Sequence, residues 1–314
     1  MKRSWLYQAA LLAAAGLVLW YFASNTVQNL ETRKIASGFG FLAREAGFEI
    51  GETGLLAYSA ADTYLRALGV GLWNTFRVAL VGVALATLLG TAVGLARLSP
   101  NWLLAKLAAA YVEVLRNVPL LVQLFFWYAL ITETLPGPRE ALQPLPGVFL
   151  SNRGIVFPTP WSTPELSGFN FTGGVTLTPE YAALLVGLTT YTAAFIAEIV
   201  RAGILSVGRG QVEAAYSLGL TRRAALRHVV LPLALRLIVP PMTSQYLNLT
   251  KNSSLAVAIG YPDLVSIANT TMNQTGQSIE GIAVIMAVYL TISLSISFFM
   301  NWYNRRVALR GMSA

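Results

Sequence analysis

Long hydrophobic blocks with few or no charges recur along the chain. Four of them are especially poor in charge: residues 5–23, 71–96, 181–207 and 281–303. Each is close to or longer than the roughly 20 residues that a helix needs to cross a bilayer at about 1.5 Å per residue. A soluble protein of this length rarely has even one such block. The pattern therefore predicts an integral membrane protein.

Two further blocks, 107–131 and 233–256, are interrupted by charges and prolines. Pro119 lies in the first, and the adjacent Pro240 and Pro241 lie in the second. Such prolines kink a helix, and in a membrane neighbouring helices or water must satisfy the freed backbone groups. The prediction is thus an all-α integral membrane fold of about six transmembrane helices, packed as a bundle around a pathway.

Composition and charge placement support this class and predict an orientation. Of the 314 residues, 55% are hydrophobic and 11% charged, whereas soluble proteins carry about 25% charged residues. With the N-terminus inside, the inner segments hold eleven Lys/Arg and one acid, and the outer segments hold six Lys/Arg and eleven acids. Because positive charge favours the cytoplasmic side, we expect both termini to be cytoplasmic. The net charge of +8 follows this alternation, so no nucleic-acid partner is expected.

The predicted organisation has two parts. Residues 1–70 would form an N-terminal transmembrane helix with an external segment, in which Tyr58 to Leu68 could be a short interfacial helix. Residues 71–314 would form the main transmembrane domain, with an inner loop at 208–232. The external loop 132–180 is rich in Pro and Gly and is predicted to lack regular elements, serving as a cap or as a partner contact. The first block is either a cleaved signal peptide or a retained anchor, and its length favours the anchor.

The chain offers little for catalysis or for metal binding. It has no cysteine and one histidine, His228. No nucleophile–base pair and no phosphate-binding G-x-x-x-x-G-K-[ST] loop occurs. We therefore expect no enzyme activity, no metal site and no cofactor in this chain.

The inner loop has an unusual local pattern. Val212 to Leu218 contains good helix formers and lies between glycines. Gly219 suits a left-handed C-terminal cap, because it has no Cβ. Thr221 can cap a second helix that leads to Pro232. A short helix, a sharp turn and a returning helix are predicted, with Ala214 and Ala215 keeping one side small enough for another surface to approach.

This segment resembles the EAA motif of ABC importer permeases. Glu213-Ala214-Ala215 is followed after three residues by Gly219 and after nine more by Val229-Val230-Leu231-Pro232. The resemblance implies a type I importer permease in which Glu213, Ala214, Ala215 and Gly219 form the coupling helix. It also implies an ATPase dimer as partner, which would bind the ATP and Mg.

Further segments are similar to polar and general L-amino-acid permeases. They are Glu113 to Gln123, Tyr191 to Gly203, Asn29 to Leu42, Ser151 to Gly154 and Ser244 to Gly260. The resemblance implies binding-protein-dependent amino-acid transport in a bacterial inner membrane. The implied partners are a second homologous permease, an external amino-acid-binding protein, an L-amino-acid substrate and membrane lipid. Those relatives often carry an extra hydrophobic hairpin after the position of Pro158, which this chain lacks.

Charged and polar residues inside the spans are candidates for function. Glu198 and Arg201 stand at i,i+3 and either lock two helices together or line the translocation path. The polar stretch at the end of the fifth block offers substrate-path candidates: Asn248, Lys251, Asn252, Ser253 and Ser254. Lys251 could meet a substrate carboxylate, or the cluster could face the partner permease. A self-sufficient secondary transporter is the alternative, but it would leave the inner loop unexplained.

Overall fold

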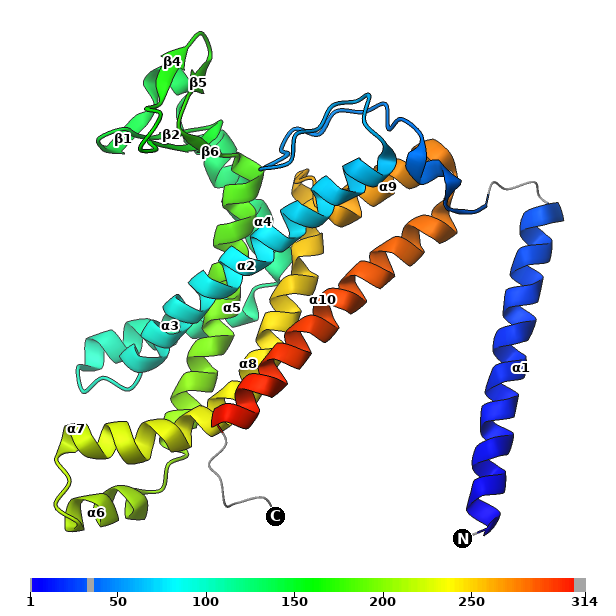
Figure 1. The fold of residues 1–314 in the computed structure, drawn as a ribbon. Coiled ribbons are helices and arrows are strands. Elements are labelled where there is room, and N and C mark those ends of the chain that lie inside the picture. Colours follow the sequence, from blue (N-terminus) through cyan, green and yellow to red (C-terminus); the bar gives the residue numbers. More distant parts are fainter. Residues whose placement is uncertain (1, 33–36, 308–314) are drawn as a thin grey trace.

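The computed structural model describes residues 2–32 and 37–307 (Figure 1). Ten α-helices are present in this part of the chain: α1 Lys2–Thr32, α2 Tyr64–Ala96, α3 Trp102–Asn117, α4 Leu120–Ala129, α5 Pro179–Leu205, α6 Arg209–Ser217, α7 Arg222–Ala225, α8 Leu231–Asn252, α9 Leu264–Thr275 and α10 Ser278–Val307. Figure 1 places α6 and α7 at one end of the bundle, called the α6 end below, and the strands and α9 at the other, called the sheet end.

The expected transmembrane architecture is confirmed. Five helical stretches in the described residues are long and apolar enough to cross a membrane. They contain α1, α2, α5, α8 and α10. The pair α3–α4 makes a sixth span if it is counted as one. The described side chains of α1 are almost all exposed, and this helix lies apart from the others in Figure 1.

The third span is broken, so the prediction of one helix over 107–131 was wrong. Helix α3 ends at Asn117 and α4 begins at Leu120, with a bend of 104° between them. Pro119 disfavours helical backbone at the residue before it, and Val118 accordingly has extended torsion angles. The side-chain amide of Gln123 donates to the carbonyl oxygens of Leu115 at 2.9 Å and of Val118 at 3.0 Å. These bonds satisfy backbone groups released by the break.

Helix α8 passes through its two prolines without interruption. Pro240 and Pro241 lie inside the helix Leu231–Asn252, and both are exposed. A 3₁₀ helix, η5 (Ser253–Ile259), continues it to Gly260. The proline pair therefore does not divide this span into separate helices.

Small residues allow α2 and α5 to pack closely. Gly82, Ala86, Gly90 and Gly94 recur at every fourth position of α2, and all are buried. A Cβ added at Gly90 would lie 2.6 Å from the Ile196 Cβ and 2.8 Å from the Ala193 carbonyl oxygen. This small-x-x-x-small pattern is the usual means of close helix approach in membranes, where dispersion contacts replace the hydrophobic effect. The α2–α5 contact thus forms the centre of the bundle.

The loop 132–180 contains β-structure, contrary to the prediction. The strands are β1 Leu142–Leu145, β2 Val148–Ser151, β3 Gly154–Phe157, β4 Glu165–Ser167, β5 Asn170–Thr172 and β6 Val175–Leu177. An antiparallel sheet has the order β1-β2-β3-β6, and β4 and β5 form a separate hairpin. The strands have only three or four residues each, too few for a periodic pattern to stand out against the prolines.

The segment 37–63, called the strap, crosses the sheet end and is tied to the turn between α9 and α10. The Gln277 side-chain amide in this turn donates to the Gly38 carbonyl oxygen at 2.7 Å, and the Gly38 amide donates to Glu280 at the start of α10 at 2.5 Å. The predicted interfacial helix from Tyr58 to Leu68 was wrong, because α2 itself begins at Tyr64 with Thr63 as its N-cap. The expected domain boundary at residue 70 thus lies within α2, and helix α9 was not anticipated.

We predict that Gly90→Leu disrupts the bundle. The larger side chain has no space against Ile196 and Ala193, and overpacking of this kind typically costs about 1–3 kcal/mol. The variant should show a lower melting temperature in detergent. The matched control is Ala92→Leu, an exposed position on the same helix, which should melt like the parent. Equal melting of the two variants would contradict a central α2–α5 contact.

Candidate functional site

The loop 208–232 forms the predicted helix, turn and returning helix at the α6 end. Helix α6 ends at Ser217, and Gly219 adopts a left-handed backbone with φ of +80°. The Leu220 amide donates to the Ala215 carbonyl at 3.1 Å, and the Gly219 amide donates to the Tyr216 carbonyl at 2.9 Å. These two bonds close the helix end in the manner of a Schellman motif.

The returning helix begins as expected. The Thr221 hydroxyl accepts from the Ala224 amide at 3.3 Å and caps α7. The chain then continues through a wider helical turn, Leu226–Val230, into α8, with Pro232 in the first turn. The α6–turn–α7 unit is therefore joined directly to a spanning helix, so a displacement of α6 can be transmitted to α8.

The four motif residues do not share one surface. Ala215 is buried at 3% exposure, whereas Glu213 and Ala214 are exposed. Tyr216 and Leu218 are also exposed, Leu218 at 83%. Ala215 thus packs inward and holds α6 in place, while α6 presents a small, partly apolar outer surface.

Some of the substrate-path candidates at the C-terminal end of α8 lie on one exposed face of the helix. Ser244, Asn248 and Lys251 are exposed and follow helical spacing. Pro241 lies on the same face one turn earlier. Within the described residues Lys251 has no ion-pair partner. A charged and polar face on a spanning helix is costly against lipid, so this face needs a protein or aqueous neighbour.

The other members of the polar cluster turn away from that face. Ser253 is buried, and its hydroxyl donates to the Thr250 carbonyl at 2.8 Å. Ser254 and Asn252 are half-buried, and the Ser254 hydroxyl donates to the Lys251 carbonyl at 2.8 Å. These hydroxyls thus satisfy local backbone. The cluster read from the sequence divides into an exposed pair, Asn248 and Lys251, and an inward-turned remainder.

Glu198 links two helices near the α6 end. Its carboxylate pairs with Arg97 at the C-terminal end of α2 and, at 2.6 Å, with Arg201 on its own helix α5. The Arg97–Glu198 pair joins residues 101 positions apart. By contrast, Glu113 and Arg116 form no ion pair in the described part of the chain, and the Arg116 guanidinium lies 5.0 Å from the centre of the Phe195 ring.

A second charged group, which the sequence reasoning missed, lies near the sheet end. Arg77 pairs with Glu52 of the strap, donates to the Tyr261 hydroxyl at 3.0 Å and lies 4.2 Å from the centre of the Tyr181 ring. The Thr178 hydroxyl donates to Glu52 at 2.6 Å. Arg77 is the single charge in the block 71–96, and an intramembrane charge generally has a partner. That rule could have prompted a search for Glu52.

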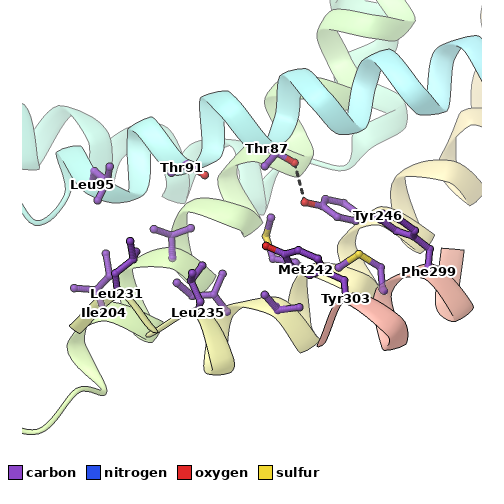
Figure 2. A pocket seen from close by; sticks show the side chains of 14 residues that line it. Thr87, Thr91, Leu95, Ile204, Leu231, Leu235, Met242, Tyr246, Phe299 and Tyr303 are labelled. Atoms are coloured by element: carbon purple, nitrogen blue, oxygen red, sulfur yellow. Dashed lines mark hydrogen bonds between the residues drawn. The ribbon is translucent and has the colours of Figure 1, made fainter. Parts of the chain in front are cut away.

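Figure 2 shows an apolar cavity between α2, α5, α8 and α10, with a volume of about 460 Å³. Its main polar feature is the hydrogen-bond contact between the Thr87 and Tyr246 hydroxyls at 3.0 Å. None of the substrate-path candidates lines it. A zwitterion needs donors for its carboxylate and acceptors for its ammonium, so this cavity is unsuited to a free amino acid.

Comparison with known proteins decides the family. Residues 82–309 match the family described as binding-protein-dependent transport system inner membrane component. The chain belongs to this family. It is the membrane-spanning permease subunit of an ABC importer and resides in the inner membrane. It is not an enzyme, because a separate ATPase chain hydrolyses the ATP, and an external binding protein is a further partner.

Two similar sequences cover nearly the whole permease. The putative amino-acid ABC transporter permease protein YhdX of Escherichia coli (strain K12) is 47% identical, over 98% of this chain and 94% of that protein. The general L-amino acid transport system permease protein AapQ of Rhizobium johnstonii is 42% identical, over 98% and 92%. The alignment with YhdX spans 373 positions, more than the 314 residues of this chain. That relative therefore has residues without a counterpart here.

Solved structures agree on the fold. A crystal structure of an amino acid ABC transporter with histidines is 27% identical, with a TM-score of 0.59 over 77% of this chain and 95% of that one. An inward-facing structure of the MetNI methionine ABC transporter is 20% identical, with a TM-score of 0.55 over 78% and 98%. The bundle is thus the permease fold of ABC importers.

Proposed function

We propose that this permease imports polar L-amino acids into a bacterial cell, from an external amino-acid-binding protein and with energy from a separate ATPase dimer. The observation that carries the proposal is similarity over nearly the full chain to proteins named as amino-acid permeases. One relative, named for glutamate, glutamine, aspartate and asparagine transport, is also similar, at 37% identity over 96% of this chain. We infer a broad range of polar substrates. ATP and Mg would bind only to the ATPase.

Helix α6 is proposed to be the coupling helix. Glu213 and Ala214 on its outer surface would enter a groove of the ATPase, and Ala214 is small enough to allow close contact. Ala215 and Gly219 would maintain the shape of the loop, the first by packing inward and the second by reversing the chain. Because α7 continues into α8, movement of the ATPase would rotate or shift α8 and thereby change access to the pathway.

The exposed polar face of α8 is proposed to line the substrate path beside a second, homologous permease. Asn248 and Lys251 would meet the substrate, with Lys251 opposite its carboxylate. Ser253 and Ser254 would support this region by satisfying local backbone, and the half-buried Asn252 would lie beside the path. Phe298 on α10, by contrast, belongs to an apolar exposed surface that would face lipid. For Glu198 and Arg201 we favour a structural role, since Glu198 joins α5 to Arg97 of α2.

Both termini are proposed to be cytoplasmic, with the strands external. The charge asymmetry of the segments supports this orientation. The α6 end carries Arg222, Arg223 and Arg227 in exposed positions, and docking to a cytoplasmic ATPase requires the same orientation. Part of the argument depends on Arg310, which lies outside the described residues.

We predict that Gly219→Val uncouples transport but leaves the bundle intact. A β-branched residue at φ of +80° is strongly disfavoured, and such strain costs about 1–3 kcal/mol. ATPase recruitment and substrate-stimulated ATP hydrolysis in reconstituted complexes should fall. Gly219→Asn is the matched control, because Asn tolerates left-handed backbone, and it should keep most of the coupling. Full uptake by Gly219→Val would refute the assignment of α6.

The orientation can be tested with single cysteines, because the chain has none of its own. Ser167→Cys lies in an exposed strand of the external hairpin and should react with an impermeant maleimide added to spheroplasts. Ser151 is unsuitable because it is buried at 1% exposure. Ser217→Cys on α6 should react only after the membrane is opened. The opposite pattern would invert the orientation.

We predict that Lys251→Cys in the assembled complex reacts with a hydrophilic maleimide, because the α8 face borders an aqueous path. Phe298→Cys is the control for a lipid-facing position, with a parent side chain that is 77% exposed, and should react only with a lipid-soluble maleimide. If both cysteines reacted only with the lipid-soluble reagent, Lys251 would not belong to the path.

A further inference from the structure

Asp263 is the N-cap residue of α9 at the sheet end. Its buried side chain lies where α9, α10, α2 and η5 meet. Asp263 is 0% exposed. One carboxylate oxygen, Oδ1, accepts from the Ser266 amide at 2.8 Å and caps α9. The other, Oδ2, is buried and has no hydrogen-bond partner. A buried polar atom without a partner is costly and calls for an explanation.

A second group without a hydrogen-bond partner lies beside the carboxyl group of Asp263. The Tyr289 hydroxyl of α10 is buried without a partner, and it lies beside the carboxyl group of Asp263 and the hydroxyls of Thr75 and Ser253. Those hydroxyls donate elsewhere: Thr75 to the Gly71 carbonyl at 3.0 Å and Ser253 to the Thr250 carbonyl at 2.8 Å. Thr75 also accepts from the Leu264 amide at 3.0 Å. The Tyr289 hydroxyl can therefore donate to one of these hydroxyl oxygens while its own oxygen still accepts.

Among residues 2–32 and 37–307, no Lys or Arg forms an ion pair with Asp263. Of the charged groups on the elements packed around it, Arg77 of α2 is engaged by Glu52 and Tyr261. Thr75 and Asn74 of α2 and Ser253 of η5 do not titrate, and the Tyr289 hydroxyl from α10 is neutral. Burial accordingly raises the pKa of Asp263 to about 7.

We propose that Asp263 binds a proton on Oδ2 and that the resulting hydroxyl group donates a hydrogen bond to the Tyr289 hydroxyl oxygen. This hydrogen bond, called the latch, holds the start of α9 against α10 and α2. The proton comes from the external solution and returns to it, and no other bond is made or broken. The assignment of the sheet end as external rests on the proposed function. The latch itself rests on the buried, unpartnered atoms.

The latch has a defined pH dependence. A carboxyl group whose pKa is higher in the closed state than in an open, hydrated state stabilises the closed state fully below its ordinary pKa. That stabilisation is lost as the pH rises from about 4 to about 7. Above this window both states are ionised, and pH has no further effect through this group.

Opening of the latch would reach the polar end of α8. The 3₁₀ helix η5 connects that end directly to the turn before Asp263. The side-chain amide of Asn74 connects the same turn to the strap. It donates to the carbonyl oxygens of Pro262 at 3.0 Å and of Glu52 at 2.7 Å. Ionisation of Asp263 would favour arrangements in which water enters between α9, α10 and α2, so the external mouth opens more readily at higher pH.

The latch can be tested by hydrogen–deuterium exchange of the α9 amides, Leu264–Thr275. The exchange is measured on the full chain in lipid nanodiscs at pH 5 and pH 8 and is corrected for intrinsic rates. The protection factors at pH 8 should be lower than those at pH 5 by roughly tenfold or more. Each pH unit within the window changes the open-to-closed ratio by up to about tenfold. Asp263→Asn mimics the protonated acid, with an amide that donates to Tyr289 and an oxygen that still caps α9, and should remove the dependence. Asp62→Asn, a turn-capping aspartate of the strap, should retain it.

Two results would overturn the proposal: a pH dependence that persists in Asp263→Asn, or a change in protection that follows sodium concentration at constant pH, which would indicate a bound cation. If Asp263→Asn fails to insert into the membrane, the variant Tyr289→Phe provides the test of the latch. Loss of the hydroxyl oxygen that accepts the Asp263 proton should destabilise the protonated closed state and move the midpoint to lower pH, and an unchanged midpoint would refute the latch. The measurement needs no transport, so its failure would leave the proposed import function intact.

Discussion

The close approach of α2 and α5 is the contact on which the rest of the bundle depends. Gly90 and Gly94 of α2 lie against the backbone of α5, with no room for a Cβ. Within a bilayer, burial of apolar side chains gives little net gain over contact with lipid, so helices associate through dispersion contacts between closely fitting surfaces. Helices α4 and α8 pack against α5, and α9 packs against α2. Both ends of the molecule are therefore built on this one helix pair.

Ionic contacts hold this pair at both ends. Glu198 of α5 joins Arg97 of α2 near the α6 end, and Arg77 of α2 joins Glu52 and the ring of Tyr181 of α5 near the sheet end. Removing one partner from such a pair would leave a poorly hydrated charge, which is far costlier than the pair itself is stabilising. The α2–α5 pair is thus fixed by contacts near both of its ends.

The candidate site could be predicted in part. The turn at Gly219, the cap at Thr221 and the short helix before them were expected, because each depends on the backbone preferences of a few neighbouring residues. The inward position of Ala215 was not expected, since it depends on packing with the returning chain. The polar stretch near Lys251 looked like one cluster, but helical geometry turns Ser253 away from Lys251.

The amino-acid sequence by itself determined the membrane class, the approximate spans and the helix–turn–helix form of the loop 208–232. These features depend on block hydrophobicity and on local backbone chemistry, and even the break at Pro119 has a local cause. Only the tertiary structure decided the pairing of Arg97 with Glu198, the sheet in 132–180, helix α9 and the buried surroundings of Asp263. These features join residues far apart in sequence, or depend on strands too short to show a period. Their free energies come from contacts that exist only after the helices have packed.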